Sequence, residues 1–239
     1  MSSDQKPPRF TRDDLVQGLK DGSFKKKVHL RFEPWCVAAL TNGELLVTGD
    51  EHRIWTLDKE GEKVRYIQVI GAKEADETTK GITVDGLGRI IVTIGHQVFV
   101  LTPRGEALLK FGDKGQGQQQ LCSSLRLAVN SKNQIIVTDW SNDSVKIFDP
   151  AGLHLFTCGS HGSEPGQLDH PWSVITDIED NIIVADYRNH RVSLFSRDGT
   201  FIRHVLTQEE QKLNWPKGLA LTQDGYLAVS DWHSINMFW

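Results

Sequence analysis

An apolar strand pattern recurs five times along the chain and constrains its fold more than any other feature. The spacings between successive copies are 45, 45, 47 and 45 residues, and the copies are centred on Leu46, Ile91, Ile136, Ile183 and Ala228. A period of this length is typical of an array of supersecondary units rather than of one irregular domain. The chain is therefore expected to consist of five stacked repeats.

The fullest repeat, residues 170–206, divides into four short segments at turn-forming residues. The predicted strands are residues 173–176, 182–185, 192–195 and 201–205. Glu179, Asp180 and Asn181 separate the first two, and Arg197, Asp198 and Gly199 separate the last two, as tight hairpins require. Each repeat is therefore predicted to be a four-stranded antiparallel meander.

Four-stranded sheets that repeat at this spacing are the blades of a β-propeller, which closes radially to cover apolar faces and strand edges. The predicted fold is all-β, with five blades in residues 21–239 and a tail or short helix in residues 1–20. The last repeat has three strands, and residues 21–24 (Asp-Gly-Ser-Phe) resemble the entry to a fourth strand at residues 198–201. An N-terminal strand at residues 27–32 is therefore expected to complete the last blade and close the ring.

Residues 186–195 (DYRNHRVSLF), which follow Gly166, Gln167, Leu168 and then His170, Pro171, Trp172, resemble an NHL repeat. Such repeats form the C-terminal propellers of the tripartite-motif proteins, which usually have six blades. The third and fourth copies resemble the repeat most, whereas the first two have Gly49 and Ile94 at the aspartate position. The resemblance implies a recognition propeller for RNA or for proteins destined for ubiquitination, with either five blades or a sixth outside this chain.

The composition is that of a globular domain, with 38% hydrophobic and 24% charged residues among 239 and a formal net charge of −4. There is no apolar run of membrane length and no secretory signal in the polar first residues. Cys36, Cys122 and Cys158 lack a paired-motif spacing, which favours a reducing, cytoplasmic compartment.

Connectivity sorts the side chains between the two ends of the propeller. The loops from second to third strand and from blade to blade lie at one end, where aromatic, basic and histidine residues gather, whereas Asp and Glu gather at the other. The predicted partner-binding residues are Trp35, Arg53, Lys80, Arg126, Trp140, His170, Trp172, Tyr187, Arg188, Trp215, Lys217 and Trp232. Such a rim suits a protein partner, because Trp, Tyr and Arg are enriched at interface hot spots. It equally suits single-stranded RNA, and the indoles alternatively plug gaps between blades.

The sequence argues against catalysis. Asp139, Asp186 and Asp231 recur after the second strand, where turn aspartates accept amide hydrogen bonds, so we expect a structural role. The histidines have no short ligand-pair spacing, so no metal site and no cofactor is predicted. The innermost strands contain no carboxylate or histidine, unlike those of metal-dependent propeller hydrolases and lyases.

The predicted function is thus a non-catalytic recognition module, a monomer that binds a protein partner and recruits substrates in a ubiquitin pathway. RNA binding, to single strands or stem-loops, is the alternative. A metal-dependent propeller hydrolase or lyase is the second alternative, and neither a membrane nor a small-molecule substrate is expected as a partner.

Overall fold

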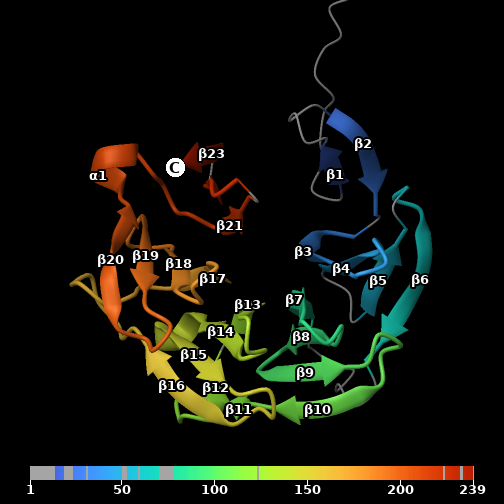
Figure 1. The fold of residues 1–239 in the computed structure, drawn as a ribbon, viewed down its shortest axis with the longest axis horizontal. Helices are drawn as coiled ribbons and strands as arrows, with labels where there is room; N and C mark the ends of the chain where they lie inside the picture. Colours follow the sequence, from blue (N-terminus) through green and yellow to red (C-terminus); the bar gives the residue numbers. More distant parts are fainter. Residues whose placement is uncertain are drawn as a thin grey trace, which may run out of the picture.

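The computed structural model describes residues 14–18, 24–30, 32–49, 53–58, 60–69, 78–122, 124–222, 224–231 and 234–238. They form a five-bladed β-propeller whose antiparallel sheets surround a common axis (Figure 1). The expected all-β architecture and the number of blades are confirmed.

Each blade is a meander whose strands pair in chain order. Blade 1 comprises β3 (Pro34–Ala39), β4 (Leu45–Gly49), β5 (Arg53–Leu57) and β6 (Lys63–Gln68), and blade 2 comprises β7 (Thr79–Val84), β8 (Ile90–Ile94), β9 (Gln97–Leu101) and β10 (Ala107–Phe111). Blade 3 comprises β13 (Ser124–Val129), β14 (Ile135–Asp139), β15 (Ser144–Phe148) and β16 (His154–Cys158), and blade 4 comprises β17 (Pro171–Thr176), β18 (Ile182–Asp186), β19 (Arg191–Phe195) and β20 (Phe201–Leu206). Blade 5 has three described strands, β21 (Gly218–Leu221), β22 (Leu227–Ser230) and β23 (Ile235–Phe238).

Short elements lie in the connections. A two-residue parallel pair, β11 (Asp113–Lys114) and β12 (Gln120–Leu121), precedes blade 3, and a 3-10 turn, η1 (Trp140–Asn142), joins β14 to β15. One turn of helix, α1 (Gln208–Gln211), leads from blade 4 to blade 5.

The recurring apolar segments are the second strands of the blades. Every residue of β8, β14 and β18 is buried, because neighbouring blades cover both faces of these strands. Ile54 of blade 1 packs with Phe99 of blade 2, and Ile147 of blade 3 packs with Phe195 of blade 4 in the same way. The core therefore lies between blades, and the first strands β3, β7, β13, β17 and β21 contact one another in sequence around the axis.

The hairpins at one end of the ring repeat a single turn design. Asp58, Asp85, Asp149 and Asp177 each accept hydrogen bonds from the backbone amides two and four positions later, at 2.8–3.0 Å. This is the Asx-turn geometry that short acidic side chains favour. The acidic end predicted from connectivity therefore consists partly of carboxylates that shape its turns.

The N-terminal residues differ from the prediction. Strand β1 (Asp14–Gly18) pairs antiparallel with β2 (Phe24–His29), and no strand among the described residues pairs with the outer edge of β23. In Figure 1, β1 and β2 lie on one side of the interval between the first and last blades, and β23 lies on the other. The expected closing strand at 27–32 is thus wrong, because β2 pairs with β1, which is close in sequence and therefore costs little loop-closure entropy.

The helix expected near the N-terminus is not present at residues 14–18, which form β1. The rest of that predicted segment lies outside the described residues. Over the described ranges, no helix has the length and apolar composition needed to cross a membrane.

Candidate partner-binding site

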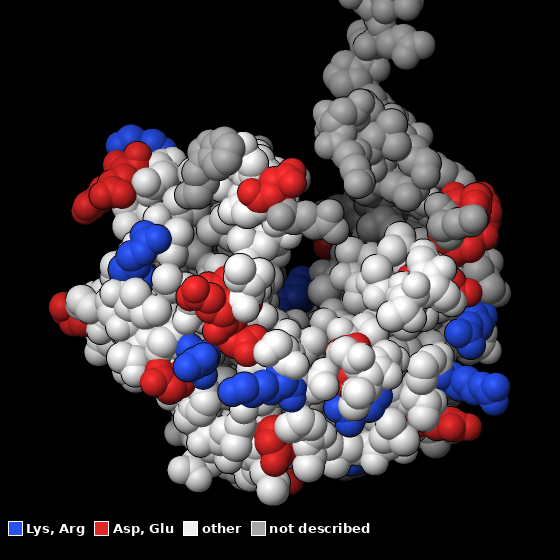
Figure 2. Space-filling view, viewed as in Figure 1, with Lys and Arg blue, Asp and Glu red and all other residues white. Residues whose placement is uncertain are grey.

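The first strands of all five blades surround a cavity of about 690 Å³ on the propeller axis. Figure 2 shows a hollow at the centre of the ring with Lys and Arg atoms in its depth. The cavity wall is mostly apolar, with polar side chains from Thr83, Arg126, Ser173, Thr176 and Ser230 among those that line it.

Arg126 reaches this cavity from a position where the other blades carry small residues. The backbone amides of Gly81, Arg126 and Gly218 each donate to a hydroxyl oxygen of the second strand of their own blade. This shared hydrogen bond shows that the three residues occupy equivalent positions in blades 2, 3 and 5. The Arg126 guanidinium donates a 2.7 Å hydrogen bond to the carbonyl oxygen of Trp35, across the ring in blade 1. The Arg126 side chain therefore occupies a position at which blades 2 and 5 carry glycine.

Two lysines lie within electrostatic reach of Arg126. Burial lowers the pKa of Lys80 from its ordinary value, and the Arg126 charge lowers it further; the same two causes, in that order, lower the pKa of Lys217. Burial also lowers the pKa of Arg126 itself, while Cys36 opposes that shift. The three cations thus come from blades 2, 3 and 5 and destabilise one another's charge.

An aromatic cluster adjoins these cations. Trp140, Trp172 and Tyr187 lie with ring centroids 5.1–5.4 Å apart, and the Lys217 ammonium lies 4.6 Å from the Trp172 ring centroid. His170 packs edge-on against Trp140 at 4.5 Å. These rings come from the β14–β15 and β18–β19 connections and from the start of β17, so two blades build the cluster.

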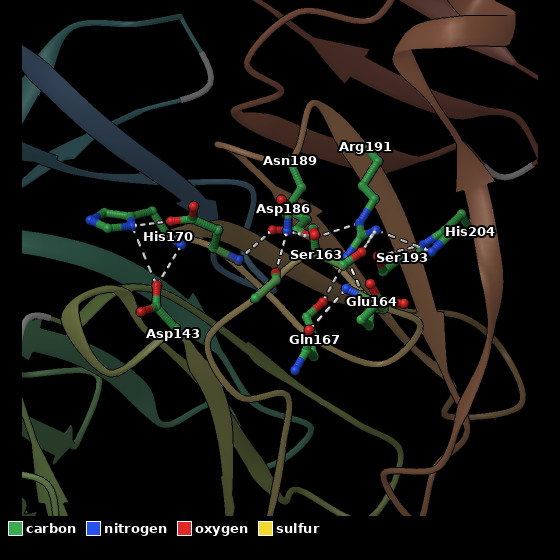
Figure 3. Close-up of polar contacts among 12 residues, drawn as sticks. Asp143, Ser163, Glu164, Gln167, His170, Asp186, Asn189, Arg191, Ser193 and His204 are labelled. Atoms are coloured by element: carbon green, nitrogen blue, oxygen red, sulfur yellow. Dashed lines mark hydrogen bonds and ion pairs between the residues drawn. The ribbon is translucent and has the colours of Figure 1, made fainter.

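A buried carboxylate holds the loop behind the aromatic cluster in place. Asp186 accepts hydrogen bonds from the Asp169 amide, the Asn189 side chain and Arg191 Nε at 2.8–2.9 Å (Figure 3). Arg191 donates onward to the carbonyl oxygens of Ser163 and Gln167 at 2.7 and 2.8 Å. Burial raises the pKa of Asp186, although these three hydrogen bonds oppose the shift.

Blade 3 repeats this arrangement with a lysine. Asp139 accepts from the Cys122 amide at 2.9 Å and from Asn142 Nδ2 at 2.7 Å, and Lys146 Nζ lies 3.3 Å from its carboxylate. In blade 5, Asp231 accepts from the Ser234 amide at 2.9 Å. The structural role predicted for the recurring aspartates therefore agrees with their contacts, and we call the Asp–Asn–Arg/Lys networks of blades 3 and 4 the loop clamps.

The structure brings together most of the predicted rim. Eight residues meet at the cation group and the aromatic cluster, namely Trp35, Lys80, Arg126, Trp140, His170, Trp172, Tyr187 and Lys217. Arg53 instead lies over Tyr66 at 4.5 Å, on the outer strands of blade 1, because it begins a third strand. Trp215 pairs with His190 at 4.8 Å, the Arg188 side chain is exposed, and Trp232 lies outside the described residues.

Sequence reasoning missed the small polar residues of the cavity wall. Cys36, Ser173 and Ser230 line it, and Cys36 Sγ donates to the Ile82 carbonyl oxygen at 3.7 Å. A register shift near the start of β3, β7, β13 and β17 precedes the cavity-lining part of these strands, and the sequence carries no signal for it.

Comparisons with known proteins identify the fold alone. The sequence matches no protein-family model and no curated protein. A protein of unknown function from Bacteroides caccae is similar with a TM-score of 0.72 at 16% identity, over 92% of this chain and 79% of that chain. A catalytically inactive virginiamycin B lyase from Staphylococcus aureus with quinupristin gives 0.71 at 14% identity, over 95% and 77%.

A streptogramin B lyase structure is also similar, with a TM-score of 0.63 at 13% identity over 95% of this chain and 86% of that chain. At such identities the likeness supports the β-propeller architecture and carries no function with it.

Proposed function

We propose that the chain is a non-catalytic recognition module that binds an acidic segment of a protein partner where the axial cavity meets the aromatic cluster. The observation that carries the proposal is the convergence of Lys80, Arg126 and Lys217 beside Trp172. The NHL-like residues of blades 3 and 4 suggest substrate recruitment in a ubiquitin pathway as the biological setting.

Electrostatics favour an anionic ligand at this place. Burial lowers the pKa of all three cations, and the Arg126 charge lowers the pKa of both lysines further, so a carboxylate between them would offset the repulsion and regain part of the lost solvation. Within the described part of the chain, the Lys80 ammonium makes no hydrogen bond or ion pair. An acidic side chain that binds near Arg126 would therefore also attract this ammonium.

The packing of the rings favours a protein over RNA. A base needs an accessible ring face on which to stack. Trp140, Trp172 and Tyr187 turn faces and edges towards one another, and Lys217 covers part of Trp172. The parts of these rings that remain accessible suit contacts with a peptide, because Trp and Tyr are enriched at protein interfaces.

The cavity lining supports a module without catalytic groups. Among the described residues that line it there is no Asp, Glu or His. General acid–base catalysis and metal ligation both require such side chains. The Cys36 thiol is half-buried, and it donates to the Ile82 carbonyl oxygen rather than to a base.

The proposal is tested by selecting a random peptide library on the purified chain and measuring the affinity of the enriched peptides. We expect acidic sequences, and at least tenfold weaker binding to a Lys80→Gln/Lys217→Gln variant, because two of the three attracting charges are removed. Lys132→Gln is the matched control, since Lys132 is exposed on a hairpin at the other end of the ring.

Three outcomes would refute the binding of an acidic protein segment at this site. One is a selection without acidic bias, and another is unchanged affinity in the double variant. The third is tight binding of an RNA pool with a steep salt dependence, which would instead favour the RNA alternative. Loss of quinupristin on incubation with the chain would refute the non-catalytic part of the proposal.

A further inference from the structure

A second polar cluster lies outside the axial cavity, where the connection after β14 meets the connection before β17. His161 Nδ1 lies 3.0 Å from Asp143 Oδ2, and His170 Nδ1 lies 2.5 Å from Asp169 Oδ1 and 3.3 Å from Asp143 Oδ1. Asp143, His161 and Asp169 each offer one ligand atom, and these three atoms lie within 4.8 Å of one another. Figure 3 shows Asp143 and His170 turned towards each other.

We propose that Asp143, His161 and Asp169 bind one divalent transition-metal ion of the Zn²⁺ type, with His170 Nδ1 supporting the two carboxylates. Imidazole nitrogen and carboxylate oxygen together are the donor set that Zn²⁺ accepts in four-coordinate sites. Ca²⁺ and Mg²⁺ prefer oxygen ligands alone, so the His161 imidazole favours a transition metal over either.

A cavity beside the cluster provides independent support. Asn142, Asp143 and His161 all line a polar cavity of about 400 Å³. The Asn142 amide donates from Nδ2 to Gly115 O and to Asp139 Oδ2, which fixes its orientation and leaves Oδ1 buried with no partner in the described structure. A buried oxygen without a donor needs a water or a cation, and both would be available from a hydrated metal ion in this cavity.

The protein holds the proposed ligands in place before any ion binds. The backbone amide of His170 donates to Asp143 Oδ1 at 2.7 Å, and the Asp169 amide donates to Asp186 in the loop clamp at 2.8 Å. The Asp143 and Asp169 side chains are 13% and 25% exposed, whereas that of His161 is 74% exposed and can move onto an entering ion. Supporting hydrogen bonds of this kind are typical of metal sites.

The cation site does not depend on the proposed function, but the two are adjacent. His170 packs on Trp140 at 4.5 Å and contacts both carboxylates, so an ion held by Asp143 and Asp169 would fix one edge of the aromatic cluster. The ligands come from separate connections of two blades, which explains why their sequence spacing shows no metal motif.

The test is a calorimetric titration of the chelator-treated chain with ZnCl2. We expect one Zn²⁺ per chain and a Zn²⁺-dependent rise of the unfolding midpoint, because the ion binds the folded state. Asp143→Asn/Asp169→Asn should weaken binding at least tenfold, and His161→Gln should also weaken it. Asparagine tolerates the left-handed backbone at Asp143 (φ 49°) and retains an acceptor oxygen, so the fold should be kept.

Asp224→Asn and His154→Gln are the matched controls, since they make the same changes away from the cluster and should leave Zn²⁺ affinity unchanged. Absence of stoichiometric binding would overturn the inference. So would Zn²⁺ binding that survives in the double Asp variant, or equal affinity for Ca²⁺ that His161→Gln does not alter. Partner selection on the metal-free chain separates failure here from failure of the proposed recognition function.

Discussion

The loop clamp of blade 4 should be among the most sensitive points of the fold. Asp186 is fully buried and Arg191 is 8% exposed, with 2.8 Å between Arg191 Nε and Asp186 Oδ2. Asp186→Asn keeps the size of the side chain but removes its charge, and it leaves the guanidinium buried against neutral carbonyl oxygens and the His204 ring, with no anionic partner. Breaking a buried pair in this way costs about 3–5 kcal/mol of unfolding free energy.

For a chain of this length, that loss corresponds to a fall of roughly 6–20 °C in the thermal midpoint. Urea unfolding monitored by circular dichroism measures the free energy directly. The connection over residues 159–169 should also become more sensitive to proteases, since the clamp holds it through Gly162, Ser163 and Gln167.

Two further variants separate the buried charge from a general effect of losing an aspartate. Asp177→Asn, in the same blade, changes a turn carboxylate for a good turn residue and should cost less than about 1 kcal/mol. Asp186→Asn/Arg191→Met should be more stable than the sum of its single changes implies, because it no longer buries an unpaired cation. An Asp186→Asn protein within about 1 kcal/mol of the wild type would refute the reasoning.

Two other predictions concern titratable side chains. Burial and Arg191 lower the pKa of His204, and burial and Lys146 lower that of His154, so the unfolded chain binds protons more readily at both. Unfolding free energy should therefore decrease as pH falls through about 6.5, the ordinary value for histidine. His204→Gln/His154→Gln should flatten this dependence in urea midpoints measured from pH 8 to 5, and an equally steep profile in the variant would contradict the assignment. Burial raises the pKa of the Cys158 thiol to about 12, so Cys158 should resist alkylation at pH 8 until the chain unfolds; peptide mapping that shows rapid labelling would count against it.

The fold could be predicted because its strongest signal is local and repeated. Each second strand is apolar in both side-chain directions, as in Ile135, Ile136 and Val137, and the turn residues between strands mark their ends. The order of strands also predicted at which end of the ring each loop lies. It therefore placed Trp140, Trp172 and Tyr187 at the same end without any distance information.

Other features depend on distances that connectivity does not supply. Arg53 shares a face of the ring with Arg126, yet it starts an outer strand and lies over Tyr66. The pairing of β2 with β1 was not predicted, because residues 14–18 were expected to form a tail or a short helix rather than a strand. Asp143 and Asp169 come together because each forms part of a connection that the loop clamps hold, and no spacing rule records that contact.

The loop clamps also imply that local stability differs between the two halves of the ring. Blades 3 and 4 fasten their preceding connections with a buried carboxylate, whereas Gly49 and Ile94 occupy that place in blades 1 and 2. Thermal breathing should therefore begin in the first two blades, while the half that carries Trp172 and Tyr187 keeps its shape. Every blade contributes to the wall of the axial cavity. Local opening of blades 1 and 2 would therefore widen the cavity on their side, while the aromatic cluster on the opposite side would stay in place.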